Sequence, residues 1–235
     1  MSHYEQLDNL VQTRVKTLAH LQHMHSGTAF YLDTVRVTPD LLVNECQLQQ
    51  LLRVLLSSHI SLLQADAYDN AVSAKRCWQY KYLGLSVGGL LVIANPVEFV
   101  KALNVLLLEY ENETEAKRVV IPTDLFRRRQ VQPNDLSNVT ATFLETGVYQ
   151  YLETPDLPFD LDYSQVFMSL CDALIAAYNK LIDGTDDVCG QGYLDASKRF
   201  DALIKKIIAN VYRDLENMSV TVMRNELAMF LEGKQ

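Results

Sequence analysis

The sequence contains few of the residues that interrupt regular structure. Its 235 residues include nine glycines and six prolines, fewer than a loop-rich or all-β protein of this length needs for its turns. Apolar residues make up 49% of the chain and charged residues 21%, close to the average of globular proteins. This composition excludes a disordered chain, which requires low hydrophobicity and high net charge. We expect a globular protein long enough to bury a substantial core.

The chain also lacks an excess of positive charge. Lys and Arg number 21 against 29 Asp and Glu, which gives a net charge of −8. No segment is basic overall, so a surface that follows nucleic-acid phosphates is not expected. The densest basic feature is the run Arg127, Arg128 and Arg129 beside Phe126. This run is a candidate contact for an acidic partner protein, and a short localisation signal is the alternative.

Cysteines are few and widely spaced. Cys46, Cys77, Cys171 and Cys189 form no C-x-x-C pair and no dense framework, which indicates free thiols in a reducing compartment. Residues 1–16 contain no apolar stretch of the kind found in secretory signals. The sequence therefore predicts a cytoplasmic protein.

Long hydrophobic runs are absent as well. The longest uncharged apolar run, residues 82–94, has 13 positions, whereas a membrane-spanning helix needs about 20. We expect no transmembrane segment. Peripheral contact with a membrane through residues 78–93 is an alternative that the sequence leaves open.

Helical patterns fill most of the N-terminal part, residues 1–118. Residues 3–25 carry apolar side chains at helical spacing, namely Leu7, Val11, Leu18 and Leu21. Thr38-Pro39 is a helix start signal before a leucine-rich segment, 41–63. A polar break is expected at 66–70, followed by a further helical run. Asn95-Pro96 with Glu98 then predicts the start of another helix.

Residues 119–160 differ in character and are expected to connect two helical parts. Four of the six prolines lie here, at positions 122, 133, 155 and 158. The pattern between them fits a weak helix or a pair of short strands, and its period does not decide between the two.

The C-terminal part, residues 161–235, is predicted to be a helical hairpin. Asp162 and Gln165 indicate a helix start, and residues 183–192 form a polar loop before a second, long helix with a break near Asn217. The apolar positions of the two helices are Phe167, Leu170, Leu174, Tyr178 and Leu181, then Phe200, Leu203, Ile207, Val211, Leu215, Met218 and Val222. The expected fold is an all-α bundle of roughly six to eight helices, packed as one domain.

The stretch Gly84-Leu85-Ser86-Val87-Gly88 matches the G-x-S-x-G motif of serine hydrolases. In an α/β-hydrolase the catalytic histidine follows the serine in the chain. All five histidines precede Ser86, and the alternation of strands and helices that would build a parallel sheet is missing. We therefore expect Gly84, Gly88 and Gly89 to mark a close approach of two backbones.

No metal or cofactor site is predicted. His20 and His23 share a helix face, but two ligands rarely make a site and no cysteine or carboxylate motif accompanies them. His59 is expected to be a hydrogen-bonded core residue. The acidic loop 183–195 fails as an EF-hand, because Val188 and Leu194 occupy the positions where glycine and the bidentate glutamate are needed.

The segment 75–82, KRCWQYKY, mixes cations with aromatic side chains, a composition that is common at protein interfaces and membrane surfaces. We expect a non-enzymatic adaptor, scaffold or complex subunit that binds other proteins through a helix face or groove. The candidate contacts are Trp78, Tyr80 and Arg127 to Arg129. The alternatives are a peripheral lipid-associating protein and, third, a hydrolase that uses Ser86.

Overall fold

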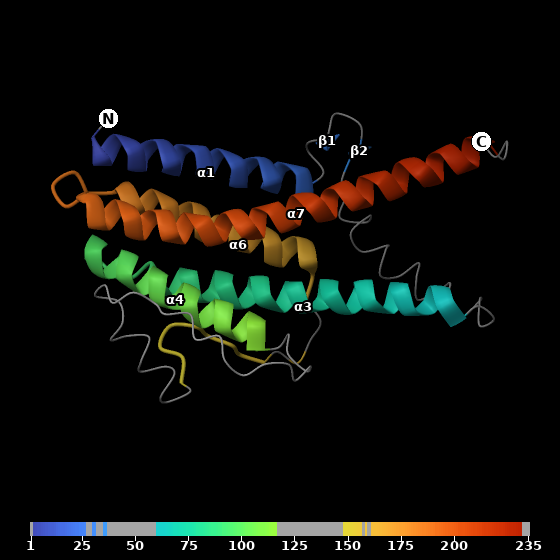
Figure 1. Ribbon diagram of the computed structural model, residues 1–235, viewed down its shortest axis with the longest axis horizontal. Helices are drawn as coiled ribbons and strands as arrows, with labels where there is room; N and C mark the ends of the chain where they lie inside the picture. Colours follow the sequence, from blue (N-terminus) through green and yellow to red (C-terminus); the bar gives the residue numbers. More distant parts are fainter. Residues whose placement is uncertain are drawn as a thin grey trace, which may run out of the picture.

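The computed structural model describes residues 2–26, 30–31, 35–36, 60–116, 148–156, 158 and 161–231. These residues contain five helices and one pair of short strands (Figure 1). The helices are α1 (His3–His25), α3 (Ile60–Leu90), α4 (Pro96–Ala116), α6 (Tyr163–Ile182) and α7 (Gln191–Leu231). The strands β1 (Phe30–Tyr31) and β2 (Val35–Arg36) pair antiparallel. The all-α prediction is confirmed for this part of the chain, while most of the predicted helix over 41–63 and most of the connector lie outside it.

The five helices lie side by side, with successive described helices running in opposite directions (Figure 1). Every helix contributes to one buried core, for example through Leu18, Leu83, Leu106, Leu174 and Ile204. Full burial of each such leucine or isoleucine contributes about 1.5 to 3 kcal/mol relative to exposure. The N-terminal and C-terminal helices thus stabilise each other through shared apolar contacts.

Local capping signals position the helix starts. Ser2 and Glu5 form a reciprocal capping box at α1: the Ser2 hydroxyl accepts the Glu5 N–H at 3.1 Å, and the Ser2 N–H donates to the Glu5 carboxylate at 2.8 Å. Asn95 Oδ1 accepts the N–H groups of Val97 and Glu98 at the start of α4. Asp162 accepts the Gln165 N–H at 2.8 Å at the start of α6. Each cap contributes about 1 kcal/mol, and the predicted starts at Asn95 and Asp162 are confirmed.

Two predicted helix breaks are wrong. α3 runs without interruption from Ile60 to Leu90 and so passes through residues 66–70, and α7 continues through Asn217. Asp and Asn cost less than about 1 kcal/mol inside a helix. At Asn217 that cost is offset by the buried neighbours Leu215 and Ser219 on the packed face of the helix.

The glycines of the 84–89 stretch lie inside α3 and differ in their surroundings. A Cβ atom at Gly84 would lie 3.4 Å from the Leu170 Cα, so α3 and α6 approach closely there. A Cβ at Gly88 meets nothing within 4 Å, and one at Gly89 meets only the Glu153 carboxylate at 3.7 Å. The expected close approach is present at Gly84, whereas Gly88 and Gly89 have room for a side chain.

Candidate functional site

An aromatic pocket lies between α3 and α4, and we call it the Trp78 pocket. Its volume is about 260 Å³. The lining residues are Lys75, Trp78, Gln79 and Tyr82 from α3, with Tyr110, Glu113 and Thr114 from α4. The helical spacing of both sets, three and four residues apart, places each on one face of its helix. The pocket therefore contains the Trp78 that the sequence singled out, together with α4 residues that sequence analysis missed.

Trp78 already binds a cation within the chain. The ammonium of Lys81 lies over the Trp78 ring, 4.5 Å from its centroid, and 5.5 Å from the centroid of the Tyr82 ring. The two rings are 5.8 Å apart and tilted against each other. Lys81 also donates to the Pro155 carbonyl at 2.8 Å, and it is not part of the pocket lining. The aromatic pair thus attracts an ammonium group in the folded protein.

Residues 148–156, which we call the strap, are held against α3 and α4. The buried carboxylate of Glu109 accepts three successive backbone N–H groups, from Gln150 at 2.6 Å, Tyr151 at 2.9 Å and Leu152 at 2.8 Å. The Leu152 side chain is itself buried in the core. The strap belongs to no helix or strand, so its N–H groups have no partners in regular structure. The single Glu109 carboxylate therefore satisfies donors that would otherwise be costly to bury.

Ser86 belongs to the same anchoring system. The residue is 2% exposed, and its hydroxyl accepts the Glu153 N–H at 2.8 Å. The G-x-S-x-G stretch lies within the continuous helix α3, whereas the nucleophile of an α/β-hydrolase stands on a sharp turn between a strand and a helix. The geometry of Ser86 is that of a structural hydrogen-bond acceptor for the strap.

Tyr80 does not lie beside Trp78. It is 4% exposed and packs in the core, with its ring 5.8 Å from the Phe167 ring and 6.2 Å from the Tyr163 ring. Two residues apart on a helix means about 200° around the axis, so Trp78 and Tyr80 point to different faces. The prediction of Tyr80 as a partner contact is therefore not supported. Arg127, Arg128 and Arg129 lie outside the described residues, as do His59 and Cys46.

The described histidines have different environments. His20 and His23 are exposed on α1, and within the described part of the chain no group of three or more His, Cys, Asp or Glu side chains is placed to hold a metal ion. His25 is buried: its Nδ1 lies 2.7 Å from the Leu21 carbonyl, and its ring centroid is 4.3 Å from that of Phe167. Burial lowers the pKa of His25 below its ordinary value, and the hydrogen bond to Leu21 raises it in part.

A buried ion cluster joins α1, α6 and α7, and sequence analysis missed it. Arg14 Nε donates to Asp201 Oδ1 at 2.7 Å, and the Tyr178 hydroxyl donates to the same oxygen at 2.9 Å. Lys205 lies 2.9 Å from the second carboxylate oxygen. Burial raises the pKa of Asp201, but the hydrogen bonds from Arg14, Lys205 and Tyr178 outweigh it and hold that pKa below its ordinary value. Every charge in the cluster has a partner, which is typical of a structural element.

The described cysteine thiols are protonated in the folded chain. Burial raises the pKa of Cys77 to about 11 and that of Cys171 to about 12. Burial also raises the pKa of Cys189. Since the thiolate is the reactive form of cysteine, none of these three side chains has the environment of a nucleophile.

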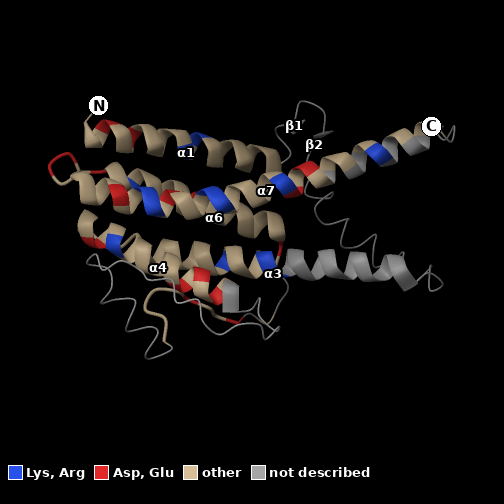
Figure 2. Cartoon of the chain, in the orientation of Figure 1, with Lys and Arg blue, Asp and Glu red and all other residues tan. Residues whose placement is uncertain are grey.

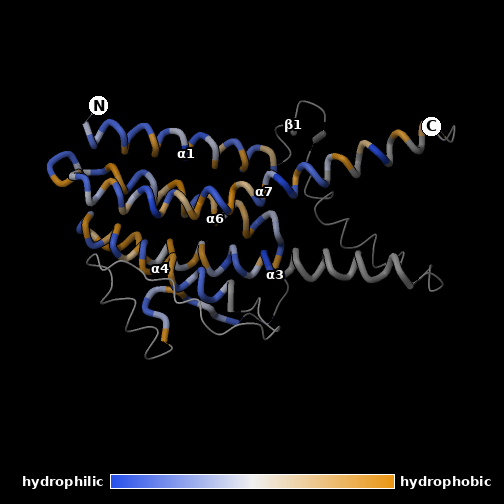
Figure 3. Tube along the Cα trace, viewed as in Figure 1, coloured by the Kyte–Doolittle hydropathy of each residue, from blue (hydrophilic) through white to orange (hydrophobic). Residues whose placement is uncertain are grey.

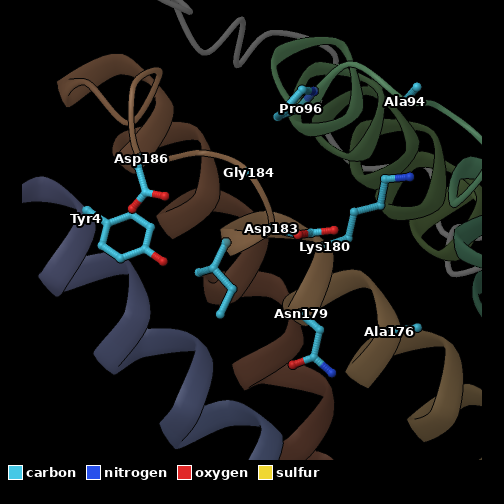
Figure 4. Close-up of a pocket in the computed structure, with 10 residues that line it drawn as sticks. Tyr4, Ala94, Pro96, Ala176, Asn179, Lys180, Asp183, Gly184 and Asp186 are labelled. Carbon is cyan, nitrogen blue, oxygen red and sulfur yellow. The ribbon is translucent and has the colours of Figure 1, made fainter.

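A second depression, of about 700 Å³, lies at the end of the bundle where the α6–α7 loop approaches the start of α1 and the α3–α4 loop (Figure 4). Figure 4 shows Tyr4 facing Asp186 on one side and Lys180 extending toward Ala94 and Pro96 on the other. The Lys180 ammonium donates to the Leu91 carbonyl and lies 5.1 Å from the centroid of the Phe99 ring. Its cation is thus engaged in joining α6 to the α3–α4 loop.

The end of α7 carries exposed apolar side chains. α7 has 41 residues against 20 in α6, and its C-terminal turns project beyond α1 and α6 (Figure 1). Four large apolar residues there are 42 to 75% exposed: Met223, Leu227, Phe230 and Leu231. We call these four residues the α7 tip face; Figure 3 shows hydrophobic positions along this part of the helix.

The α7 tip face begins where the buried part of α7 ends. At 100° per residue its four members fall within about 100° of one another, and Met223 lies one turn beyond the buried Ser219, about 40° from it around the helix axis. The tip face is therefore the exposed continuation of the surface that α7 packs into the core.

Comparison with protein-family models, with curated proteins and with solved structures gave no match to this chain. Within the described helices, none combines the length and the apolar character that a membrane crossing requires.

Proposed function

We propose that this protein is a cytoplasmic, non-enzymatic adaptor or complex subunit that binds other proteins through a helix face. The observation that carries the proposal is the α7 tip face. A helix that presents apolar side chains three and four residues apart fits the helix-in-groove mode of recognition, in which such a helix lies in a hydrophobic groove of a partner.

The chemistry of the described side chains supports this proposal. Ser86 and Glu109 are engaged with backbone N–H groups of the strap, and the charges of Arg14 and Asp201 neutralise each other. By contrast, Leu227 and Phe230 are 58% and 72% exposed. Large exposed apolar side chains grouped on one surface are typical of interaction sites.

Affinity purification of the full chain from cells tests the proposal, with the double variant Leu227→Asp/Phe230→Asp as the decisive comparison. We expect the native chain to recover a protein partner in stoichiometric amount and the double variant to lose it, because two carboxylates on the tip face must be desolvated on binding. Val92→Asp is the matched control: Val92 is apolar and 85% exposed, in the α3–α4 loop. It should retain the partner.

Recovery of no stoichiometric partner, or equal loss with the Val92 control, would contradict the proposal. Peripheral lipid association is the competing outcome. Co-sedimentation with neutral or anionic vesicles that disappears in the Leu227→Asp/Phe230→Asp variant would assign the tip face to a membrane surface instead of a protein groove.

A further inference from the structure

We propose that the Trp78 pocket binds a methylated ammonium group, presented as a methylated lysine side chain by a partner protein. The binding of the ammonium group follows from the pocket itself. The claim that a partner protein supplies this group rests on the proposed function. The experiment below tests binding of the ammonium group and its source separately.

The size of the pocket limits its occupant. Its volume of about 260 Å³ lies below the range of about 300 to 1,000 Å³ that is typical of pockets for cofactors and other small molecules. A pocket of this size accepts a single side chain or headgroup.

The aromatic lining selects a cation. Trp78, Tyr82 and Tyr110 supply three rings, and ring faces attract cations through their quadrupole, with Trp the strongest of the three types. Lys81 demonstrates this attraction, because its ammonium lies over Trp78 and Tyr82 without lining the pocket. Rings of this kind grouped around a quaternary ammonium form the arrangement known as an aromatic cage.

The electrostatics of α4 also favour a cation. Glu113 lines the pocket, and with Glu109 and Glu111 it gives the end of α4 an acidic character that Figure 2 shows. Tyr110, Glu113 and Thr114 lie in the last two turns of α4, whose bounds are Pro96–Ala116. The carboxyl end of a helix carries a partial negative charge that stabilises cations. Among the described residues of the lining, Lys75 is the one cationic side chain, and it opposes this attraction.

A methylated ammonium fits this lining better than an unmodified one. An unmodified lysine has three N–H donors and is strongly hydrated, so it loses hydrogen bonds on entering an aromatic pocket. Two of the polar groups here are already engaged: Glu113 accepts the Tyr149 hydroxyl at 2.9 Å, and the Thr114 hydroxyl donates to the Glu111 carbonyl at 3.0 Å. Methylation removes the donors and retains the positive charge.

A protein is favoured over a phosphocholine lipid as the source of the ammonium. The phosphate of a lipid headgroup would approach the carboxylate of Glu113 in the pocket lining, which repels it. The net charge of −8 favours encounter with a basic partner.

The chain contains its own reporter, because Trp78 is its only tryptophan. Titration of the full chain with choline chloride, at constant ionic strength adjusted with potassium chloride, should change Trp78 fluorescence saturably. The expected dissociation constant is about 1 to 10 mM, as befits a ligand of few atoms. The neutral isostere of choline, with a tert-butyl group in place of trimethylammonium, should bind at least about fivefold more weakly. Absence of a saturable change, or equal binding of the isostere, overturns the proposal.

Three variants test the electrostatics. Glu113→Gln keeps an oxygen that can accept the Tyr149 hydroxyl and should weaken choline binding about fivefold, whereas Lys75→Gln should strengthen it by a similar factor. Glu111→Gln is the matched control, because Glu111 lies outside the lining and pairs with Lys206 at 3.1 Å. Equal effects of the Glu113 and Glu111 variants, or stronger binding in Glu113→Gln, would overturn the assignment.

A final arm identifies the source. A lysine-rich peptide with one trimethyllysine should bind more tightly than its unmodified form, and phosphatidylcholine vesicles should leave Trp78 fluorescence unchanged. Binding of the vesicles without discrimination between the two peptides would overturn the protein source. Choline binding combined with failure of the α7 tip face experiment would leave the pocket assigned and the proposed function contradicted, so the two failures are distinguishable.

Discussion

Arg14 and Asp201 form a buried ion pair across 187 positions of the sequence, with the Arg14 Nε 2.7 Å from Asp201 Oδ1. The pair joins α1 to α7, and the Tyr178 hydroxyl adds α6 to the same carboxylate. A buried pair of this kind does little for stability compared with a well-packed apolar replacement, but removal of one partner leaves an uncompensated charge. The register of three helices against one another is fixed at this point.

Asp201→Ala is expected to lower the free energy of unfolding by about 3 to 5 kcal/mol, because Arg14 remains buried without its counter-ion. Urea denaturation followed by far-UV circular dichroism measures the change. Lys205→Ala is the control: the Lys205 side chain is 61% exposed, and an exposed partner contributes about 0 to 1 kcal/mol. Similar losses for both variants would contradict the role assigned to the buried pair.

His25 is expected to make the folded state less stable as the pH falls below about 6.5, the ordinary pKa of histidine. Burial holds its pKa lower in the folded chain than in the unfolded chain, so the unfolded state binds more protons in that window and stability rises with pH. Denaturation midpoints between pH 7.5 and 5 measure the slope. His25→Leu should flatten it, while the exposed His20→Gln should leave it unchanged; an unchanged slope in His25→Leu would refute the assignment.

Asp201 predicts a second loss of stability in more acidic solution. Its folded pKa lies below the ordinary value of an aspartate, so its contribution is complete above the unfolded pKa of about 3.9 and disappears as the pH falls through the folded value. Acid titration of the Asp201→Asn variant should lack this transition. If the variant retains it, another carboxylate is responsible.

Glu109→Ala is expected to release the strap. Three backbone N–H groups lose their acceptor, and each hydrogen bond to a charged group contributes about 1.5 to 3 kcal/mol when buried. Because the freed segment regains water as a partner, the net loss should be nearer about 2 to 4 kcal/mol. Limited proteolysis within 148–156 should accelerate at least several-fold, while Glu111→Gln should behave as the native chain. Equal cleavage rates would show that Glu109 does not hold the strap.

Gly88→Ala is expected to stabilise the protein by up to about 1 kcal/mol, because alanine is the better helix former and nothing lies within 4 Å of the added methyl group. Gly84→Leu should instead destabilise it, since its side chain would extend into the Leu170 backbone and side chain across the α3–α6 contact. Thermal denaturation of the two variants gives the comparison. Shifts in the same direction would contradict the different surroundings of the two glycines.

Sequence patterns predicted the features that depend on neighbouring residues. The caps at Asn95 and Asp162 require only the next few N–H groups, and the buried stripe through Leu7 and Leu18 follows from the helical period. The ion pair between Asp201 and Arg14 and the hydrogen bond from Leu152 to Glu109 depend on the tertiary arrangement, so no local sequence pattern predicts them. Trp78 and Tyr80 show what a local pattern cannot predict. The composition of segment 75–82 made both of them candidate contacts, but only the packing of α3 decides which one is buried.

The projecting end of α7 has a geometric consequence for any partner that contacts both the bundle and the α7 tip face. Both surfaces belong to the continuous helix α7, so the number of residues between Leu215 and Met223 sets their relative direction. One inserted residue would turn the tip face by about 100° and advance it by about 1.5 Å. Four inserted residues would nearly restore its direction at a greater distance. The number of residues in this part of α7 therefore sets both the direction of the tip face and its distance from the bundle.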